Sequence, residues 1–126
     1  MVAATVTLTI TAGSHAGKRF TFSKPEHCVA GRAEDCCVQV VGAFEDALLS
    51  RHHCAFNIDP PHVRVRDLGS RNGTFVNGRR IGQRDFPIPP EPTAVTAAEV
   101  ELHDGDELCL GPIPFKVLIH PRHNSR

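Results

Sequence analysis

The sequence predicts a single all-β domain, a sandwich or barrel of about ten short strands. Apolar and polar residues alternate over many short stretches, which is typical of strands with one buried face. Glycine, proline, asparagine and aspartate separate these stretches, as expected for turns. No window of helical length has apolar residues at the helical period, and residues 43–49 are expected to form one short helical turn at most.

The first strands follow from this alternation. Val6, Leu8 and Ile10 alternate with threonines, which predicts a half-buried strand. Phe20 and Phe22 alternate after a turn bounded by glycines, so we expect these two strands to pair as a hairpin.

The middle strands are expected at residues 28–30, 54–58, 63–65 and 74–76. In the second of these, apolar residues alternate until the Pro-Pro pair at 60–61 ends the strand. In the third, valines alternate with arginines, which predicts one buried and one solvated face.

Two dipeptides predict tight turns between the later strands. The Asn-Gly pair at 77–78 supplies the two positive φ values of a type I′ hairpin turn. The Asp-Gly pair at 104–105 is expected to join strands at 100–102 and 108–110 in a similar way. The last strand is expected at residues 115–119.

Residues 82–99 form the least strand-like stretch, with four prolines and few candidates for the core. We interpret this stretch as an inserted, proline-stiffened surface loop. Its PIPP sequence is also compatible with a polyproline II segment that binds an SH3-like partner.

The length and the charge of the chain limit its function. At 126 residues it has the length of one domain, which we expect to take in residues 1–119, with 120–126 as a polar tail or the start of a linker. The 14 basic side chains balance the 14 acidic ones, and tyrosine and tryptophan are absent, so we expect neither nucleic acid nor a membrane as partner. Any recognition of an anion must therefore be local.

The five cysteines, at positions 28, 36, 37, 54 and 109, follow no C-x-x-C spacing. A bridge between the neighbouring Cys36 and Cys37 would be strained. We therefore expect all five to be reduced thiols, most of them buried, in a protein of the cytoplasm.

A catalytic triad is one interpretation of Ser50, His53 and Asp67. No G-x-S-x-G elbow surrounds Ser50, and side chains on one strand or its lead-in loop point in different directions. We therefore expect no enzyme activity.

A metal centre is a second interpretation, because His52, His53 and Cys54 are three consecutive candidate ligands. Consecutive side chains on an extended backbone cannot converge on one tetrahedral ion, and zinc ligands are usually spaced by two to four residues. We expect no metal and no cofactor.

Recognition of an anion without chemistry is the interpretation that remains. Arg32 follows a strand, Ser50 and Arg51 precede the next, and Asn72 precedes another. All of these positions lie in loops at strand edges, which gather at the ends of a sandwich and can form a binding surface.

Four ordered motifs carry a family resemblance: GR at 31–32, SRHH at 50–53, DLGSRNGTFVNG at 67–78 and LHDGDELCLG at 102–111. Over roughly residues 4–119, the sequence resembles the forkhead-associated (FHA) domain. The resemblance implies an eleven-stranded, mainly antiparallel β-sandwich that binds phosphothreonine peptides through loops at one end. The family reads phosphorylated motifs with clusters of arginines.

The resemblance also implies roles for the residues that contact the phosphopeptide. Arg32 matches the arginine that binds the phosphate, and Ser50 matches the serine whose hydroxyl donates a further hydrogen bond. Arg51 is expected either to point at the phosphate or to be solvated. Asn72 matches the asparagine that pairs with the peptide main chain, and Arg71 is expected to add charge or specificity.

Further residues are expected to support this site. His53 matches a structural histidine that holds the Ser50 loop, and His52 is expected to face solvent. Gly31 and Gly73 match positions that need close backbone approach or positive φ, and Asn77 is expected to turn a hairpin rather than touch ligand.

The resemblance implies a non-catalytic, phosphothreonine-dependent binding module in Ser/Thr-kinase signalling, within a longer chain or a signalling complex. The alternative is an assembly domain that binds a partner regardless of phosphorylation, through a sheet face or the proline-rich loop.

Overall fold

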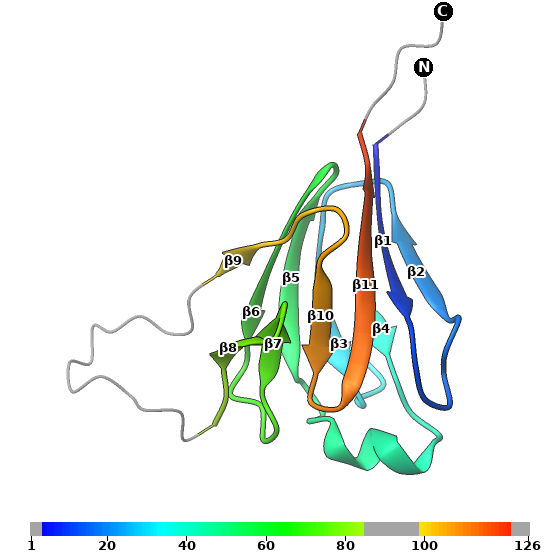
Figure 1. The fold of residues 1–126 in the computed structure, drawn as a ribbon, viewed down its shortest axis with the longest axis vertical. Coiled ribbons are helices and arrows are strands. Elements are labelled where there is room, and N and C mark those ends of the chain that lie inside the picture. The colour runs from blue at the N-terminus through cyan, green and yellow to red at the C-terminus, as the bar shows by residue number, and fades with distance from the viewer. Residues whose placement is uncertain (1–3, 85–98, 122–126) are drawn as a thin grey trace, which may run out of the picture.

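The computed structural model describes residues 4–84 and 99–121, which form two β-sheets packed face to face (Figure 1). The predicted all-β sandwich is confirmed, and the number of strands in the described residues is the eleven that the resemblance implied. The strands are β1 (Thr5–Ile10), β2 (Arg19–Phe22), β3 (Glu26–Gly31), β4 (Val38–Gln39), β5 (Cys54–Asp59), β6 (His62–Asp67), β7 (Thr74–Val76), β8 (Arg79–Gly82), β9 (Val100–Glu101), β10 (Glu107–Leu110) and β11 (Ile113–His120).

One sheet has six strands in the order β2-β1-β11-β10-β7-β8, and the other has five in the order β4-β3-β5-β6-β9. Neighbouring strands are antiparallel throughout both sheets, except for the parallel pair β3–β4. The predicted hairpin of the first two strands is confirmed as β1–β2.

The core lies between the sheets and follows the alternation in the sequence. Along β5, Cys54, Phe56 and Ile58 are buried, and along β6 the buried Val63 and Val65 alternate with exposed residues. Alternation places every second side chain on the inner face, so short strands suffice to build a continuous core.

A short 3-10 helix, η1 (Phe44–Leu48), connects β4 to β5 and agrees with the single helical turn expected at 43–49. Its Asp46 is buried and accepts hydrogen bonds from the Ala43 N–H at 2.8 Å and from His15 Nε2 at 2.7 Å. The preceding Glu45 accepts from the backbone and the hydroxyl of Ser14. These contacts fix η1 against the β1–β2 loop at one end of the sandwich.

The two predicted tight turns have different outcomes. Asn77 and Gly78 have φ values of 51° and 82° and close the β7–β8 hairpin as expected. The expected hairpin around Asp104-Gly105 is wrong, because β9 pairs with β6 in one sheet whereas β10 pairs with β7 and β11 in the other. The Asp-Gly turn therefore carries the chain between sheets: a turn sequence specifies local φ values, not the sheet in which the next strand pairs.

The expectation of five reduced thiols is also wrong. The structure joins Cys28 on β3 to Cys37 in a disulfide, with their Cα atoms 5.7 Å apart. The loop after β3 folds back along the strand, which sequence spacing alone does not reveal. Cys36, Cys54 and Cys109 are free thiols, and burial raises the pKa of each of them. The expected cytoplasmic location rests on five reduced cysteines, so the disulfide removes that support. The location itself stays a prediction.

Several expectations fall outside the described residues. The central part of the proline-rich stretch, 85–98, is one of them, and so are residues 122–126 of the expected tail. The last strand reaches His120, so the domain boundary expected after residue 119 stays a prediction. Within the described ranges, no helix is long and apolar enough to span a bilayer.

The core predicts a contrast between two phenylalanines. Phe56 is 1% exposed and Phe44 on η1 is 95% exposed. We expect Phe56→Ala to lower the free energy of unfolding by about 3–5 kcal/mol, because it removes buried contacts and leaves a cavity. Phe44→Ala is expected to change it by less than about 0.5 kcal/mol. Urea titrations measure both, and similar losses in the two variants would contradict this description of the core.

Candidate functional site

Three loops meet at the end of the sandwich opposite the start of β1 and the end of β11 (Figure 1). They are residues 32–37 after β3, 49–53 before β5 and 68–73 between β6 and β7. Backbone hydrogen bonds join the first two loops, from the Arg32 N–H to the Ser50 carbonyl at 3.2 Å and from the Ala33 N–H to the Arg51 carbonyl at 3.1 Å.

Gly31 permits this close approach. A Cβ atom at residue 31 would collide with the carbonyl of Arg51 and lie 2.8 Å from that of Ser50. Both atoms belong to backbone that is itself hydrogen-bonded, so neither can move aside cheaply. The glycine therefore sets the distance between the loops that carry Arg32 and Ser50.

His53 links the second loop to the third from a fully buried position. Its Nδ1 accepts from the Ser50 N–H at 3.1 Å, so its proton lies on Nε2, which donates to the Gly73 carbonyl at 2.7 Å. The backbone N–H of His53 donates to the Ala30 carbonyl at 2.8 Å. Burial lowers the pKa of the imidazole, which keeps it neutral in this arrangement.

Asp67 holds the third loop in shape. Its buried carboxylate accepts four hydrogen bonds, from the N–H groups of Gly69 and Ser70 and from the hydroxyls of Ser70 and Thr74. The Ser70 hydroxyl also accepts from the Gly73 N–H at 3.0 Å. Because the carboxylate is used internally, its charge does not face the surface where the loops meet.

Arg32 and Ser50 are held so that part of each polar group stays available. The Arg32 Nε donates to the Leu49 carbonyl at 2.6 Å, which fixes the guanidinium plane. Among the described residues, its two terminal nitrogens have no partner. The Ser50 hydroxyl oxygen accepts from the Arg71 N–H at 2.9 Å, which leaves the hydroxyl proton free to be donated.

An open cavity of about 440 Å³ lies over these groups, and its wall is strongly cationic. It is lined by Arg32, Ala47, Leu48, Leu49, Ser50, Arg51, His52, Leu68, Gly69, Arg71 and Arg84. Four of these residues are arginines and none carries a carboxylate. Within the ranges that the structure describes, none of the four arginines forms an ion pair. The chain has no net charge, so this concentration of positive charge is local.

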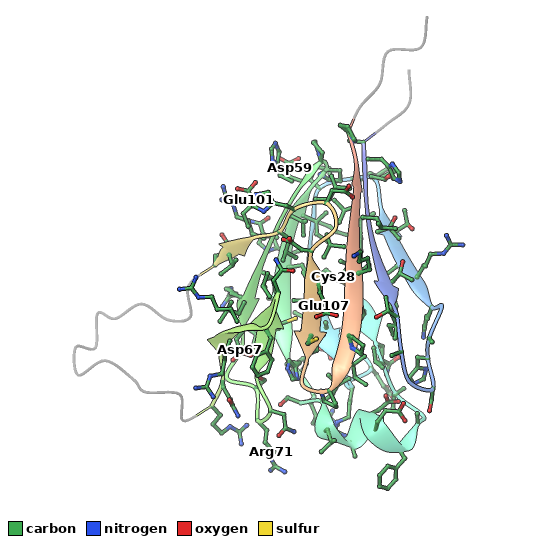
Figure 2. The ribbon with its side chains drawn as sticks, in the orientation of Figure 1. Cys28, Asp59, Asp67, Arg71, Glu101 and Glu107 are labelled. Atoms are coloured by element: carbon green, nitrogen blue, oxygen red, sulfur yellow. A yellow bond between two sulfur atoms is a disulfide. The ribbon has the colours of Figure 1, made fainter. Side chains whose placement is uncertain are left out.

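Four of the five predicted contact residues line this cavity: Arg32, Ser50, Arg51 and Arg71. Figure 2 shows Arg71 at the lower end of the molecule, below Asp67. Asn72, the fifth, is not in the cavity wall, and its Nδ2 donates to the Leu48 carbonyl at 2.8 Å. It thereby ties η1 to the third loop, so the predicted contact with a peptide main chain stays a prediction.

The predicted supporting residues occupy different places. Gly31 and His53 contact the site loops directly, and Gly73 supplies the carbonyl that His53 binds. Asn77 lies away from the cavity, where its side chain exchanges hydrogen bonds with Asp106 and the Glu107 N–H.

Sequence reasoning missed the role of Asp67 as the acceptor of four hydrogen bonds, and it missed Arg84. Arg84 follows β8 at the start of the proline-rich stretch, and its N–H donates to the Ser70 carbonyl at 2.6 Å. The DLGS motif contains a signal for Asp67, because an aspartate side chain in a turn often accepts from the backbone N–H two residues later, here that of Gly69. No local signal points to Arg84.

The geometry gives no catalytic triad. The imidazole of His53 accepts from the backbone N–H of Ser50 and not from its hydroxyl, and both ring nitrogens are used. None of the four hydrogen bonds to the Asp67 carboxylate comes from His53. A serine without a base in reach is a hydrogen-bonding group and not a nucleophile.

Comparison with known proteins identifies the family. The sequence profile of the FHA domain matches residues 28–111, two thirds of the chain. The chain belongs to the FHA domain family. This match includes the cavity residues of all three loops.

Two relatives show the extent of this similarity. The glycogen accumulation regulator GarA of Mycolicibacterium smegmatis is 30% identical over 118 residues, which covers 94% of this chain and 61% of GarA. Vacuolar protein sorting-associated protein 64 of Saccharomyces cerevisiae is 40% identical over 72 residues, 56% of this chain and 10% of that protein. The FHA domain thus spans only part of the length of both relatives.

Solved FHA domains have the same architecture. One, from a study of phosphothreonine-dependent FHA domain interactions, matches with a TM-score of 0.69 at 27% identity and covers 94% of this chain and 99% of its own. The FHA domain of FhaA, complexed with the intracellular domain of Rv3910, matches with a TM-score of 0.65 at 26% identity. The match covers 89% of this chain and 98% of the FhaA domain. The kinase-interacting FHA domain of an Arabidopsis protein phosphatase shares the fold, with a TM-score of 0.72 at 21% identity. The match covers 98% of this chain and 100% of that domain.

The neutral imidazole predicts how stability depends on pH. Burial holds the pKa of His53 below the ordinary 6.5, so the unfolded chain takes up a proton before the folded chain does. The stabilisation is complete above about pH 6.5, and it is lost as the pH falls from there through the lower folded pKa. Urea titrations between about pH 7.5 and 5 measure this loss. In His53→Gln the free energy of unfolding should change less over the same interval, and an unchanged slope would contradict the assignment.

Proposed function

We propose that this FHA domain binds protein segments phosphorylated on threonine. The observation that carries the proposal is the cavity wall, which has a free hydroxyl proton, no carboxylate and four arginines that form no ion pair with any described residue. A phosphate carries about −1.5 to −2 charges at neutral pH and three acceptor oxygens. Such a dianion complements this wall in both charge and hydrogen bonding.

The position of each residue determines which contact it would make with the phosphate. Arg32 offers its two terminal nitrogens in a plane fixed by the bond to Leu49, which suits bidentate hydrogen bonding to a phosphate. Ser50 donates its hydroxyl proton to a third contact. Arg51 and Arg71 add positive charge to the same cavity wall, and since both are exposed they reach ligand without large desolvation.

The proposed activity is binding without catalysis. His53 is neutral with both nitrogens engaged, and the Asp67 carboxylate is used inside its loop. Neither group is able to activate a nucleophile at the cavity.

Similar proteins support this proposal. One solved domain with this architecture comes from work on phosphothreonine-dependent FHA interactions, and another was captured with the intracellular domain of a protein partner. Two similar proteins are a glycogen accumulation regulator and an inhibitor of oxoglutarate dehydrogenase from Corynebacterium glutamicum, which is 36% identical over 70 residues. We infer a regulatory binding module in Ser/Thr-kinase signalling, which acts within a longer chain or a complex.

Removal of Arg32 tests the proposal. We expect Arg32→Ala to weaken binding of a phosphothreonine peptide about 100-fold or more, since two charge-assisted hydrogen bonds contribute about 1.5–3 kcal/mol each. A degenerate phosphothreonine peptide library selects a ligand, and fluorescence anisotropy then measures its dissociation constant. Peptides with threonine, aspartate or glutamate at the same position should bind far more weakly, because they offer fewer acceptors and less charge.

Arg64→Ala is the matched control for this experiment. Arg64 is an exposed arginine on β6 whose nearest acidic partner, Glu99, is 3.9 Å away, and it does not line the cavity. Its loss should leave affinity within about twofold. Binding that survives both phosphatase treatment and Arg32→Ala would overturn the proposal and favour the alternative of phosphorylation-independent assembly.

The position of Arg84 leads us to expect a preference for certain peptide residues next to the phosphothreonine. Arg84 and Arg71 both line the cavity, whose wall contains no carboxylate. We expect the library to enrich acidic residues beside the phosphothreonine, and Arg84→Ala to reduce this enrichment while phosphate dependence stays intact. Sequencing of the bound pools measures both effects, and an unchanged preference in the variant would exclude Arg84 as its source.

A further inference from the structure

Three side chains of different chemistry gather beside the cationic cavity: the carboxylate of Asp35, the thiol of Cys36 and the imidazole of His52. One ligand atom from each lies within 4.8 Å of the other two. They line or adjoin a second cavity of about 620 Å³, whose wall includes Asp35 and His52. This cavity shares Arg32, Arg51 and His52 with the first. The phosphate-binding proposal leaves these three groups without a role.

The fold brings the three groups together from two loops. Asp35 and Cys36 belong to the loop after β3, and His52 belongs to the loop before β5. The Arg51 carbonyl accepts from the Ala33 N–H at 3.1 Å and from the Cys36 Sγ at 3.3 Å, which aligns the loops side by side. His52 Nε2 then lies 2.9 and 3.0 Å from the two carboxylate oxygens of Asp35.

We propose that Asp35, Cys36 and His52 bind one divalent cation of the Zn²⁺ class. A sulfur, a nitrogen and an oxygen ligand together suit a borderline-soft ion, whereas Mg²⁺ and Ca²⁺ need oxygen ligands. Three protein ligands leave a fourth tetrahedral position for water, and two of the three ligands, Asp35 and His52, line the second cavity.

Burial of the ligands supports this arrangement. Cys36 is buried, with 7% of its surface exposed, and forms the inner wall. The side chains of His52 and Asp35 are 47% and 72% exposed, so they form the outer side and leave a path for the ion to enter. The candidate ligand atoms lie up to 4.8 Å apart, somewhat farther than ligands around one zinc ion. Because the side chains of His52 and Asp35 are exposed, they can move the short distance needed to close this gap.

Charge and proton balance are both satisfied. On binding, Cys36 releases its thiol proton to solvent, gives up its hydrogen bond to the Arg51 carbonyl and ligates as a thiolate, while the Ala33 N–H still holds that carbonyl. His52 ligates through the Nε2 lone pair, so its proton moves to Nδ1 and the hydrogen bond to Asp35 is replaced by shared coordination. The thiolate and the carboxylate neutralise the two charges of the ion, which reduces its repulsion by Arg32 and Arg51 in the same cavity wall.

This proposal departs from the expectation of no metal, and its ligands differ from the three consecutive residues on which that expectation was based. The consecutive residues His52, His53 and Cys54 do not converge: His53 faces Ser50 and Gly73, and Cys54 is fully buried. The cluster instead combines His52 with two residues that lie 16 and more positions earlier in the chain. It does not depend on phosphopeptide binding, so either proposal can fail without the other.

Cobalt(II) is a direct probe of the site, because a thiolate bound to this ion gives an intense charge-transfer absorption in the near ultraviolet. We expect the wild-type domain to bind one equivalent of Co²⁺ with this absorption, and Zn²⁺ to displace it. Cys36→Ser should abolish the absorption. His52→Gln and Asp35→Asn, which change exposed side chains and should fold normally, are expected to weaken binding by at least about tenfold.

Two control variants separate this site from nonspecific binding. Cys109→Ser removes a free cysteine outside the cluster, and His62→Gln removes an exposed histidine on β6. Both should bind Co²⁺ as the wild type does. The proposal is overturned if wild type shows no thiolate absorption, if the absorption persists in Cys36→Ser, or if His52→Gln and His62→Gln bind equally well.

Discussion

The neutral imidazole of His53 is the contact on which the loop end of this domain depends. Its ring joins two loops, through Nδ1 to the Ser50 N–H and through Nε2 to the Gly73 carbonyl, and the backbone N–H of His53 donates to Ala30 on β3. Protonation would turn Nδ1 from an acceptor into a donor that faces another donor. A buried, unprotonated ring is therefore required for Ser50 and its neighbours to hold their positions, and burial itself lowers the pKa in the required direction.

The second constraint is the placement of charge. Carboxylates are present near the cavity, but Asp67 accepts four hydrogen bonds within its own loop and Asp46 accepts two within η1 and its contact to the β1–β2 loop. Both are buried. Their charges are used inside the fold and do not neutralise the arginines at the surface. The same carboxylates that would neutralise the site thus help to build it. The exposed Asp35 beside the cavity pairs with His52.

Arg51 connects the two surfaces of this end of the molecule. Its carbonyl fixes the loop that carries Asp35 and Cys36, and its side chain lines both the cationic cavity and the cavity beside His52. The fold allows this because Gly31 lets the backbone of the two loops approach more closely than a side chain would permit. One close backbone contact therefore shapes two neighbouring sites of different chemistry.

Most of the strands and the β7–β8 turn could be predicted from the sequence, because alternation and turn residues report local geometry, but β4 was not predicted. Most residues of the cavity wall lie in loops at strand ends, which antiparallel pairing brings to one end of the sandwich. Arg32, Ser50, Arg51 and Arg71 could be placed because each lies beside a strand end within a family motif. The tertiary structure alone decided which sheet receives β10, that Cys37 reaches Cys28, that Arg84 enters the cavity and that His52 meets Asp35 and Cys36. Each of these contacts joins residues from separate loops or strands, and no local sequence pattern specifies which separate segments meet.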